Sequence, residues 1–248
     1  MIDLHDSASL RGMVLRALAA LASVLLSLSL LWADDGAERH AEEEVSCEEE
    51  AEVCIISPYD DLMRAAQEET GADWRLLCAI AREESCFIPD VVSAAGAVGL
   101  MQIMPSVGEH YGVDSASLAE PSNNIRVAAS LLTDIERIIS LPATVSDEDR
   151  LQLVLACYNG GVGHVNDARR LAEAFGENMN SWPVVARYLR LKNDPAYYEH
   201  EVVSSGCFSG GRRTAAYVRN VMSHYEQYRL ATEGRAGRDG ADAAAGRK

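Results

Sequence analysis

Apolar residues recur at helical spacing through most of the chain between residues 58 and 230. The clearest stripe, with a period of about 3.6 residues, lies in residues 122–140 and consists of Ala128, Leu131, Leu132, Ile135, Ile138 and Ile139. A second stripe, in residues 212–230, consists of Tyr217, Val218, Val221, Tyr225 and Tyr228. Each stripe predicts an amphipathic helix that buries one face against a common core.

Capping residues mark where several helices begin. Asp73 is a candidate N-cap for a helix over residues 74–84, and Ser146 opens a capping-box pattern. Ser181 is the candidate cap of a helix over residues 182–191. Further helices are predicted over residues 58–70, 105–112 and 162–175. Residues 93–103 lack a helical period and are the candidate for a small extended hairpin. The predicted fold class is therefore mainly α.

A pair of carboxylates, Glu83 and Glu84, ends the helix over residues 74–84. Apolar residues lie three, four and seven positions before Glu84, and the same is true of Glu83. Burial among apolar side chains and the negative end of a helix both raise the pKa of a carboxyl group, which can then act as a general acid near neutral pH. Spacing alone does not choose between the two glutamates, and a solvated pair at a helix end is an equal alternative.

Three motifs follow one another along the chain. They are Glu84-Ser85 with Phe87, Pro89, Ser93 and the run GAVGLMQIMP (residues 96–105), then ACYNGGVGHV (residues 156–165), then YVRNV (residues 217–221). Together they resemble the signature of the lytic transglycosylases, the SLT domain of glycoside hydrolase family 23, over residues 57–230. The segment NDPAYY, residues 193–198, is most similar to the membrane-bound F branch of that family. Cys157 and Gly160 depart from the family pattern.

The resemblance implies a lysozyme-like fold and a role for Glu84 as the catalytic acid and base. It further implies cleavage of the glycosidic bond between MurNAc and GlcNAc in peptidoglycan glycan strands, without water and with a 1,6-anhydroMurNAc end as product. Substrate contacts or support of the cleft are implied for Ser93, Gln102, Met104, Tyr158, Asn159 and Tyr217. No cofactor and no metal are expected.

Two alternatives stay open at this point. A goose-type lysozyme would share the fold and the glutamate but would need a second carboxylate to activate water, for which Glu83, Asp90 and Glu109 are candidates. A non-catalytic peptidoglycan-binding module would have no use for a glutamate with a raised pKa. Reducing ends on the released fragments would identify a lysozyme, whereas anhydro ends would identify a transglycosylase. Binding to peptidoglycan without any released fragment would identify the binding module.

The net negative charge of the chain argues against two classes of binding partner. The 248 residues carry a formal net charge of −16, and residues 1–56 hold 12 acids and 3 bases, which gives −9 there and −7 for the rest. A negative chain is poorly suited to nucleic acid or to electrostatic docking on anionic lipid. A neutral glycan, bound by stacking and hydrogen bonds, fits this balance better, and we expect no nucleic-acid partner.

The N-terminal region predicts export. Arg11 and Arg16 precede an uncharged apolar run, so residues 1–33 are interpreted as a signal peptide in preference to an uncleaved anchor, in which residues 14–33 would tether the protein to a membrane. This places the protein in the periplasm or cell envelope. Residues 34–56 predict an acidic disordered linker, residues 57–231 the catalytic domain, which is expected to be a monomer, and residues 232–248 a disordered tail.

Six cysteines occur in a chain that is predicted to be exported and can therefore hold disulfides. Cys47 with Cys54, and Cys86 with Cys207, are the candidate pairs. The remaining two, at positions 78 and 157, lie within predicted helices and are expected to be buried thiols. No histidine stands near the cysteines at the spacing of a zinc site, which argues against a metal centre.

Overall fold

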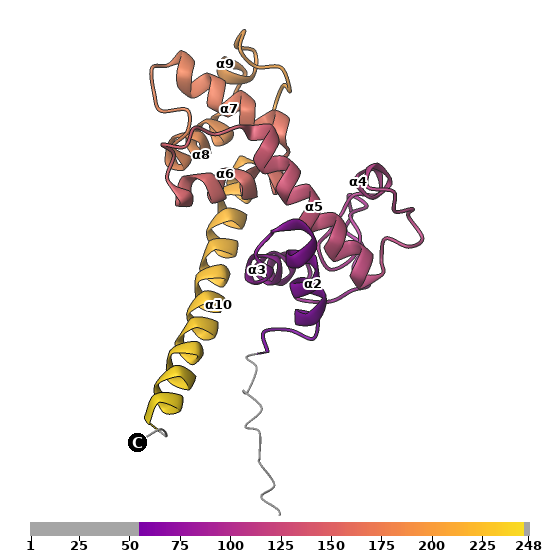
Figure 1. Cartoon of the computed structure of the whole chain (residues 1–248). Coiled ribbons are helices and arrows are strands. Elements are labelled where there is room, and N and C mark those ends of the chain that lie inside the picture. Colours follow the sequence, from indigo (N-terminus) through magenta and orange to yellow (C-terminus); the bar gives the residue numbers. More distant parts are fainter. Residues whose placement is uncertain (1–54, 246–248) are drawn as a thin grey trace, which may run out of the picture. The chain divides into compact units, whose positions relative to one another are not determined.

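The structure, a computed structural model, describes residues 55–245 (Figure 1). Its side chains are described as far as residue 233. Its helices are α2 (Asp60–Thr70), α3 (Trp74–Ser85), α4 (Pro105–His110), α5 (Pro121–Ile139), α6 (Asp147–Gly160), α7 (Val162–Ala174), α8 (Trp182–Leu191), α9 (Pro195–Tyr198) and α10 (Gly211–Ala245). The described residues contain no β-strand, and the prediction of a mainly α domain is confirmed.

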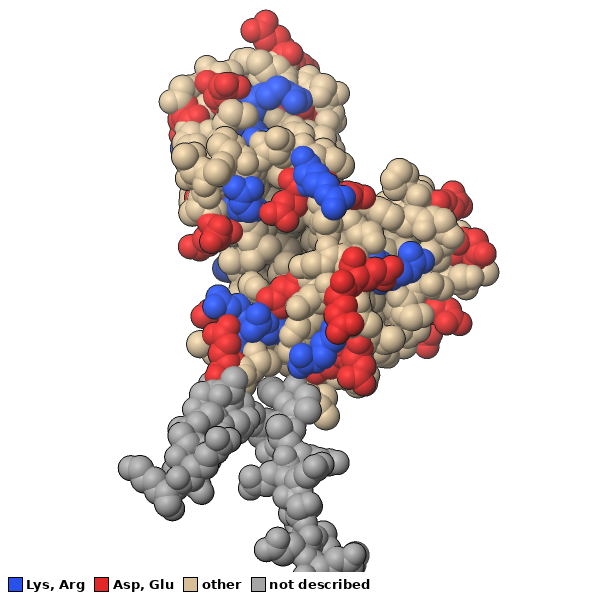
Figure 2. Space-filling model, viewed as in Figure 1, with Lys and Arg blue, Asp and Glu red and all other residues tan. Residues whose placement is uncertain are grey.

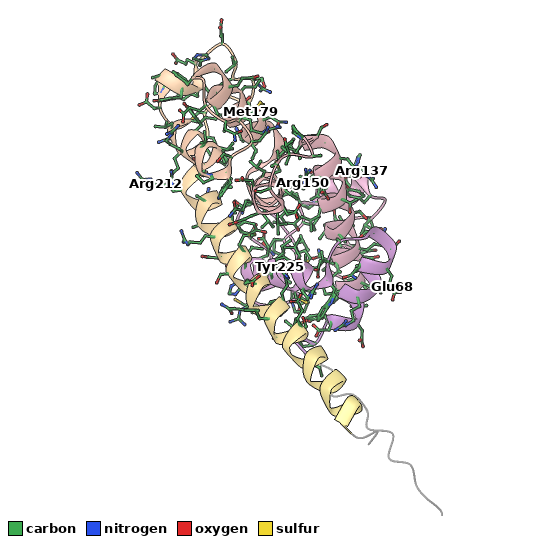
Figure 3. All side chains as sticks on the ribbon, turned by 60° about the vertical axis from the view of Figure 1, so that its left-hand side comes forward. Glu68, Arg137, Arg150, Met179, Arg212 and Tyr225 are labelled. Atoms are coloured by element: carbon green, nitrogen blue, oxygen red, sulfur yellow. The ribbon has the colours of Figure 1, made fainter. Side chains whose placement is uncertain are left out.

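Helix α3 lies in the core, and its residues 77–81 have no exposed surface. Helix α10 packs on α3 and α6, α2 packs on α3 and α5, and α7 packs on α6 and α8 (Figure 1). Tyr225 of α10, labelled in Figure 3, donates a hydrogen bond to Asp73 Oδ2 at 2.8 Å. Burial of the α3 stripe between α2, α5 and α10 therefore fixes the C-terminal end of α3, where the two glutamates lie.

Two of the predicted caps are present. The Asp73 side chain accepts a hydrogen bond from the backbone N–H of Arg75 at 2.9 Å and begins α3. The Ser146 hydroxyl accepts one from the N–H of Asp149 at 3.1 Å and begins α6. Helix α2 ends at Gly71, whose φ of 84° is the left-handed conformation that glycine adopts without strain.

The predicted cap of α8 is wrong in its chemistry. Ser181 does occupy the N-cap position, but its hydroxyl makes no capping hydrogen bond. The N–H of Trp182 instead donates to Asp149 Oδ1 of α6 at 2.7 Å. A carboxylate is a stronger acceptor than a hydroxyl at the positive end of a helix, and this one arrives from a distant part of the sequence.

The predicted hairpin is present only as two isolated antiparallel bridges, Val92 with Val98 and Val98 with Ile103. Gln102 has a positive φ of 49°, and Gly96 and Gly99 have φ values of 88° and 83°. These left-handed residues bend the backbone too sharply for a regular ladder. The segment between α3 and α4 is thus a bent loop, named the 86–104 loop below.

Helix α10 continues to Ala245, past the start of the tail of residues 232–248 that was predicted to be disordered, and the disorder of that tail stays a prediction. Thr232 donates from its hydroxyl to the carbonyl of Tyr228 at 2.9 Å, as a residue within a helix does. Beyond Thr232 the sequence to residue 245 contains no proline and five alanines, but also Gly234, Gly237 and Gly240, which are weak helix formers.

Several predictions concern residues outside the described range. The signal peptide or anchor of residues 1–33, most of the acidic linker, and the pair Cys47 and Cys54 all lie there. Between residues 55 and 245, none of the helices combines the length and the apolar character that crossing a membrane requires.

The structure confirms the predicted buried thiols and contradicts one predicted disulfide. Cys78 and Cys157 are buried thiols, as expected, and burial raises the pKa of Cys157 to about 12. Cys86 and Cys207 are both exposed and free, so their predicted disulfide is wrong. Cys86 is held as the C-cap of α3, where its N–H donates to the carbonyl of Arg82 at 3.1 Å.

Candidate active site

Glu84 occupies the last turn of α3 and is half-buried. Burial raises the pKa of its carboxyl to about 7, the Tyr217 hydroxyl opposes that rise, and the negative charge of Glu83 adds to it. The pair of glutamates is therefore not equivalent, because the structure raises the pKa of Glu84. A carboxyl with a pKa near 7 is protonated in a substantial fraction of molecules at neutral pH and can donate its proton.

Two tyrosines from different helices border Glu84. Burial, and then the charge of Glu84, raise the pKa of both Tyr158 of α6 and Tyr217 of α10 well above the usual value. The Tyr158 hydroxyl donates to the carbonyl oxygen of Met101 at 2.8 Å. The Tyr217 hydroxyl is buried beside Glu84 without a hydrogen bond of standard geometry to any described residue. It is thus a polar group available to a partner that enters the site.

One side chain ties the 86–104 loop to the helix that carries Glu84, and another braces the loop internally. The Ser85 hydroxyl donates to the carbonyl of Leu100 at 2.9 Å. The Gln102 side-chain amide donates to the carbonyls of Val91 at 3.1 Å and Gly99 at 2.9 Å. Because its amide nitrogen is engaged inside the loop, Gln102 can offer a ligand only its side-chain oxygen.

The other predicted site residues differ in position. The Ser93 hydroxyl accepts a hydrogen bond from the N–H of Ala97 at 3.0 Å, within the loop. Asn159 is exposed, and its Oδ1 accepts from the Thr214 hydroxyl at 2.9 Å, which joins α6 to α10. Met104, 40 % exposed, precedes α4. The structure thus brings Glu84, Tyr158 and Tyr217 together, and places Ser93, Gln102, Met104 and Asn159 in supporting loops and helix ends.

Asn124 of α5 is a buried residue that sequence analysis missed. Its Oδ1 accepts from the N–H of Met101 at 2.7 Å, and its Nδ2 donates to the carbonyls of Val98 at 3.0 Å and Leu118 at 2.9 Å. A Cβ added to Gly99 would lie 2.6 Å from Asn124 Nδ2, so the side chain fills the space that glycine leaves. The available signal was its place four residues before Ala128, which puts a polar residue on the apolar stripe.

The side chain of Glu83 contacts α10. Its Oε1 accepts a hydrogen bond from Asn220 Nδ2 at 3.0 Å, and its Oε2 lies 3.8 Å from His224 Nε2. The two remaining candidates for a second carboxylate, Asp90 and Glu109, are exposed. Neither side chain makes a hydrogen bond or ion pair within the described range of the chain.

Sequence analysis also missed a buried ion pair between Asp167 of α7 and Lys192, which directly follows α8. Lys192 Nζ lies 2.5 Å from Asp167 Oδ2, and neither side chain is exposed. Burial alone would raise the pKa of Asp167, but hydrogen bonds from Lys192 and from the N–H groups of Ser204 and Ser205 lower it to about 2. This pair fixes the segment that leads into α10, and hence the start of the helix that carries Tyr217.

Charged side chains are mixed on the surface. On the face drawn in Figure 2, acidic and basic residues of the described range are interspersed, and the basic ones form no continuous stripe. Among residues 55–245, no group of three or more His, Cys, Asp and Glu is placed to hold a metal ion. That the site needs no metal and no cofactor stays a prediction.

Comparison with known families defines the class of domain. Residues 61–180 match the family model of the transglycosylase SLT domain, and this region of the chain belongs to that family. Relatives include the membrane-bound lytic murein transglycosylase F of Maricaulis maris, 43 % identical over 167 residues, which are 67 % of this chain and 35 % of that protein. The protein of the same name from Alcanivorax borkumensis is 35 % identical over 168 residues, 68 % of this chain and 34 % of that protein.

The chain therefore spans about a third of the length of these curated relatives. Among solved structures, an inactive variant of the lytic transglycosylase Slt from Pseudomonas aeruginosa superposes with a TM-score of 0.50 at 22 % identity, covering 69 % of this chain and 24 % of that one. This likeness concerns the fold, and it confirms the predicted lysozyme-like architecture.

Proposed function

We propose that this chain is a peptidoglycan lytic transglycosylase that cleaves the β-1,4 bond between MurNAc and GlcNAc without water and leaves 1,6-anhydroMurNAc ends. The observation that carries the proposal is the half-buried Glu84, whose pKa burial raises to about 7, bordered by the half-buried Tyr158 and the buried Tyr217. The relatives' name, lytic murein transglycosylase, supports the substrate class.

One carboxyl group can perform both proton transfers. Glu84 first donates its proton to the glycosidic oxygen, and the bond from that oxygen to the anomeric carbon breaks with its electron pair on the leaving sugar. The resulting carboxylate then removes the proton of the MurNAc 6-hydroxyl while that oxygen bonds to the anomeric carbon. Because the attacking hydroxyl belongs to the same sugar, its effective concentration is high and no water is consumed. Glu84 ends the cycle protonated.

The hydrolytic alternative needs a second carboxylate that can hold a water molecule opposite Glu84. Glu83 accepts a hydrogen bond from Asn220 and lies close to His224, both on α10, and the exposed side chains of Asp90 and Glu109 make no hydrogen bond or ion pair with a described residue that would aim them at the site. This arrangement favours transglycosylation over hydrolysis.

The roles of the other site residues in substrate binding follow from which of their polar atoms are not already engaged in hydrogen bonds within the domain. We assign the Tyr217 hydroxyl and the Gln102 side-chain oxygen to hydrogen bonds with hydroxyl or N-acetyl groups of the sugar, and the exposed Met104 to an apolar contact. Tyr158, Ser93 and Asn159 act indirectly, because their polar groups already hold the 86–104 loop and the junction of α6 with α10. The site lies in the cell envelope in this account, with residues 14–33 as a candidate tether to the membrane and the domain acting as a monomer.

Tyr217→Phe separates function from stability. The Tyr217 hydroxyl makes no hydrogen bond of standard geometry to a described residue, so its removal changes the free energy of unfolding by about 1 kcal/mol or less. Turnover of peptidoglycan falls about tenfold, because a substrate contact is lost. Urea unfolding and the rate of fragment release measure the two effects, and Tyr228→Phe on the same helix is the matched control with normal turnover. Normal turnover in Tyr217→Phe would remove this residue from the site.

Turnover should fall as the pH rises above about 7, because the first step requires the protonated form of Glu84. Above that pH the rate drops about tenfold per pH unit, in proportion to the remaining acid. Initial rates of fragment release between about pH 5 and about pH 9 provide the profile. A rate that stays constant over the whole range would show that Glu84 is not the acid.

The proposed function is tested by digesting purified peptidoglycan sacculi with the full chain and weighing the soluble fragments by mass spectrometry. Fragments one water lighter than the hydrolysis products identify a lytic transglycosylase. Fragments with reducing ends identify a lysozyme. Binding to sacculi without any released fragment identifies a glycan-binding module.

A further inference from the structure

Glu83 is next to Glu84 in the chain, yet its side chain is held by a different helix. Asn220 of α10 donates to Glu83 Oε1 at 3.0 Å, and His224, one turn further along α10, lies 3.8 Å from Glu83 Oε2. The side chains of Glu83 and His224 are 24 % and 28 % exposed. Partial burial and the hydrogen bond from Asn220 give the Glu83 carboxylate a defined position beside α10.

A fixed negative charge beside Glu84 favours the protonated form of that carboxyl, since ionisation would create a second like charge nearby. Partial burial limits screening by water and salt, so the effect exceeds that of two fully exposed carboxylates. This agrees with the contribution of Glu83 to the raised pKa of Glu84.

Titratable side chains of two other helices lie near Glu83 and Glu84. From α10, Tyr217 faces Glu84 and His224 faces Glu83, and from α6 Tyr158 feels the charge of Glu84. In the described residues, no charged side chain of α2 or α5 makes a hydrogen bond or ion pair with either glutamate. Glu83 is therefore the negative neighbour of Glu84 that a single substitution can remove.

We propose that Glu83, hydrogen-bonded to Asn220 of α10 and lying beside His224, is a positioning residue whose charge favours the protonated form of Glu84 and so extends its action as an acid toward higher pH. The consequence for turnover rests on the proposed function. The consequence for the titration of Glu84 does not, because it concerns only these two carboxyl groups.

The test compares Glu83→Gln with the wild type in two measurements. Glutamine keeps the oxygen that accepts from Asn220 and removes only the charge. Glu68→Gln is the matched control, because Glu68 is an exposed carboxylate on α2, labelled at the edge of the molecule in Figure 3, and its loss changes the net charge equally. Thermal unfolding of all three proteins establishes that each is folded.

The first measurement is a carbon-13 NMR titration of the Glu84 carboxyl, assigned by its absence in Glu84→Gln. In Glu83→Gln the midpoint moves to lower pH, and in Glu68→Gln it stays at the wild-type value. A midpoint that is unchanged in Glu83→Gln overturns the proposal, whatever the enzyme's activity is.

The second measurement is the pH profile of fragment release. At about pH 8 the rate of Glu83→Gln falls about three- to tenfold relative to wild type, whereas at about pH 5 the two rates agree, because Glu84 is protonated in both. An equal loss at both pH values indicates a structural role and overturns the proposal. If the wild type itself releases no fragments, the proposed function fails while the NMR titration still decides the role of Glu83.

Discussion

Glu84→Gln loses turnover of sacculi by about 100-fold or more and keeps the fold of the wild type. General acid catalysis contributes about 100- to 10,000-fold in enzymes, and glutamine has no proton of suitable acidity to donate. In this account the same group performs both proton transfers, so the loss is expected near the upper end of that range. The rate of soluble fragment release, with circular dichroism for folding, measures the effect.

Glu109→Gln is the matched control, because Glu109 is an exposed carboxylate on α4 and one of the candidates for a second catalytic carboxylate. It should retain wild-type turnover. Wild-type turnover in Glu84→Gln would refute the assignment of the acid, and a large loss in Glu109→Gln would point to a hydrolytic mechanism with two carboxylates.

The same Glu84→Gln variant should be more stable than the wild type at neutral and higher pH. The pKa of Glu84 rises from 4.5 to about 7 in the folded protein, so the folded state binds more protons than the unfolded state between these values. Wild-type stability is therefore lost as the pH rises through this window, by up to about 3 kcal/mol, and glutamine does not titrate. Urea unfolding at about pH 4.5 and about pH 8 measures the difference, and a variant that is less stable at the higher pH would contradict it.

Asn124→Ala should lower the free energy of unfolding by about 3 kcal/mol and reduce turnover strongly. The buried asparagine makes three hydrogen bonds to backbone groups, and its removal leaves the N–H of Met101 and the carbonyls of Val98 and Leu118 without partners. Because Tyr158 bonds to Met101, movement of the 86–104 loop also disturbs the surroundings of Glu84.

The neighbouring residue provides the control for this prediction. Asn123 is half-buried and donates one hydrogen bond, at 3.2 Å, to the carbonyl of Ser117. Asn123→Ala should cost about 1 kcal/mol or less and leave turnover nearly unchanged. Equal urea midpoints for the two alanine variants would show that Asn124 does not support the loop.

The helices could be predicted from the sequence because their signals are local. The apolar stripe of α5, the Asp73 cap of α3 and the glycine that ends α2 all depend on residues within a few positions of one another. The family motifs also placed Glu84 at the end of its helix. The functional roles of the site residues stay predictions until the variants are measured.

The features that sequence analysis missed depend on contacts between distant segments. Asn124 meets the loop 23 residues earlier, and Asp149 caps a helix 33 residues later. The disulfide between Cys86 and Cys207 was predicted from their place in loops, although the spacing of two cysteines does not fix the distance between them in the fold. Lys192 and Asp167 likewise share no periodic pattern, and only the packing of α7 against α8 brings them together.

The central claim, that the bond is broken without water, is tested most directly by digesting sacculi in water enriched in heavy oxygen. Mass spectrometry then counts heavy atoms at the newly formed MurNAc ends. Attack by the sugar's own 6-hydroxyl predicts anhydro ends that contain no heavy oxygen. One heavy oxygen at each new end would mean that water is the nucleophile, and the chain would then be a hydrolase rather than a transglycosylase.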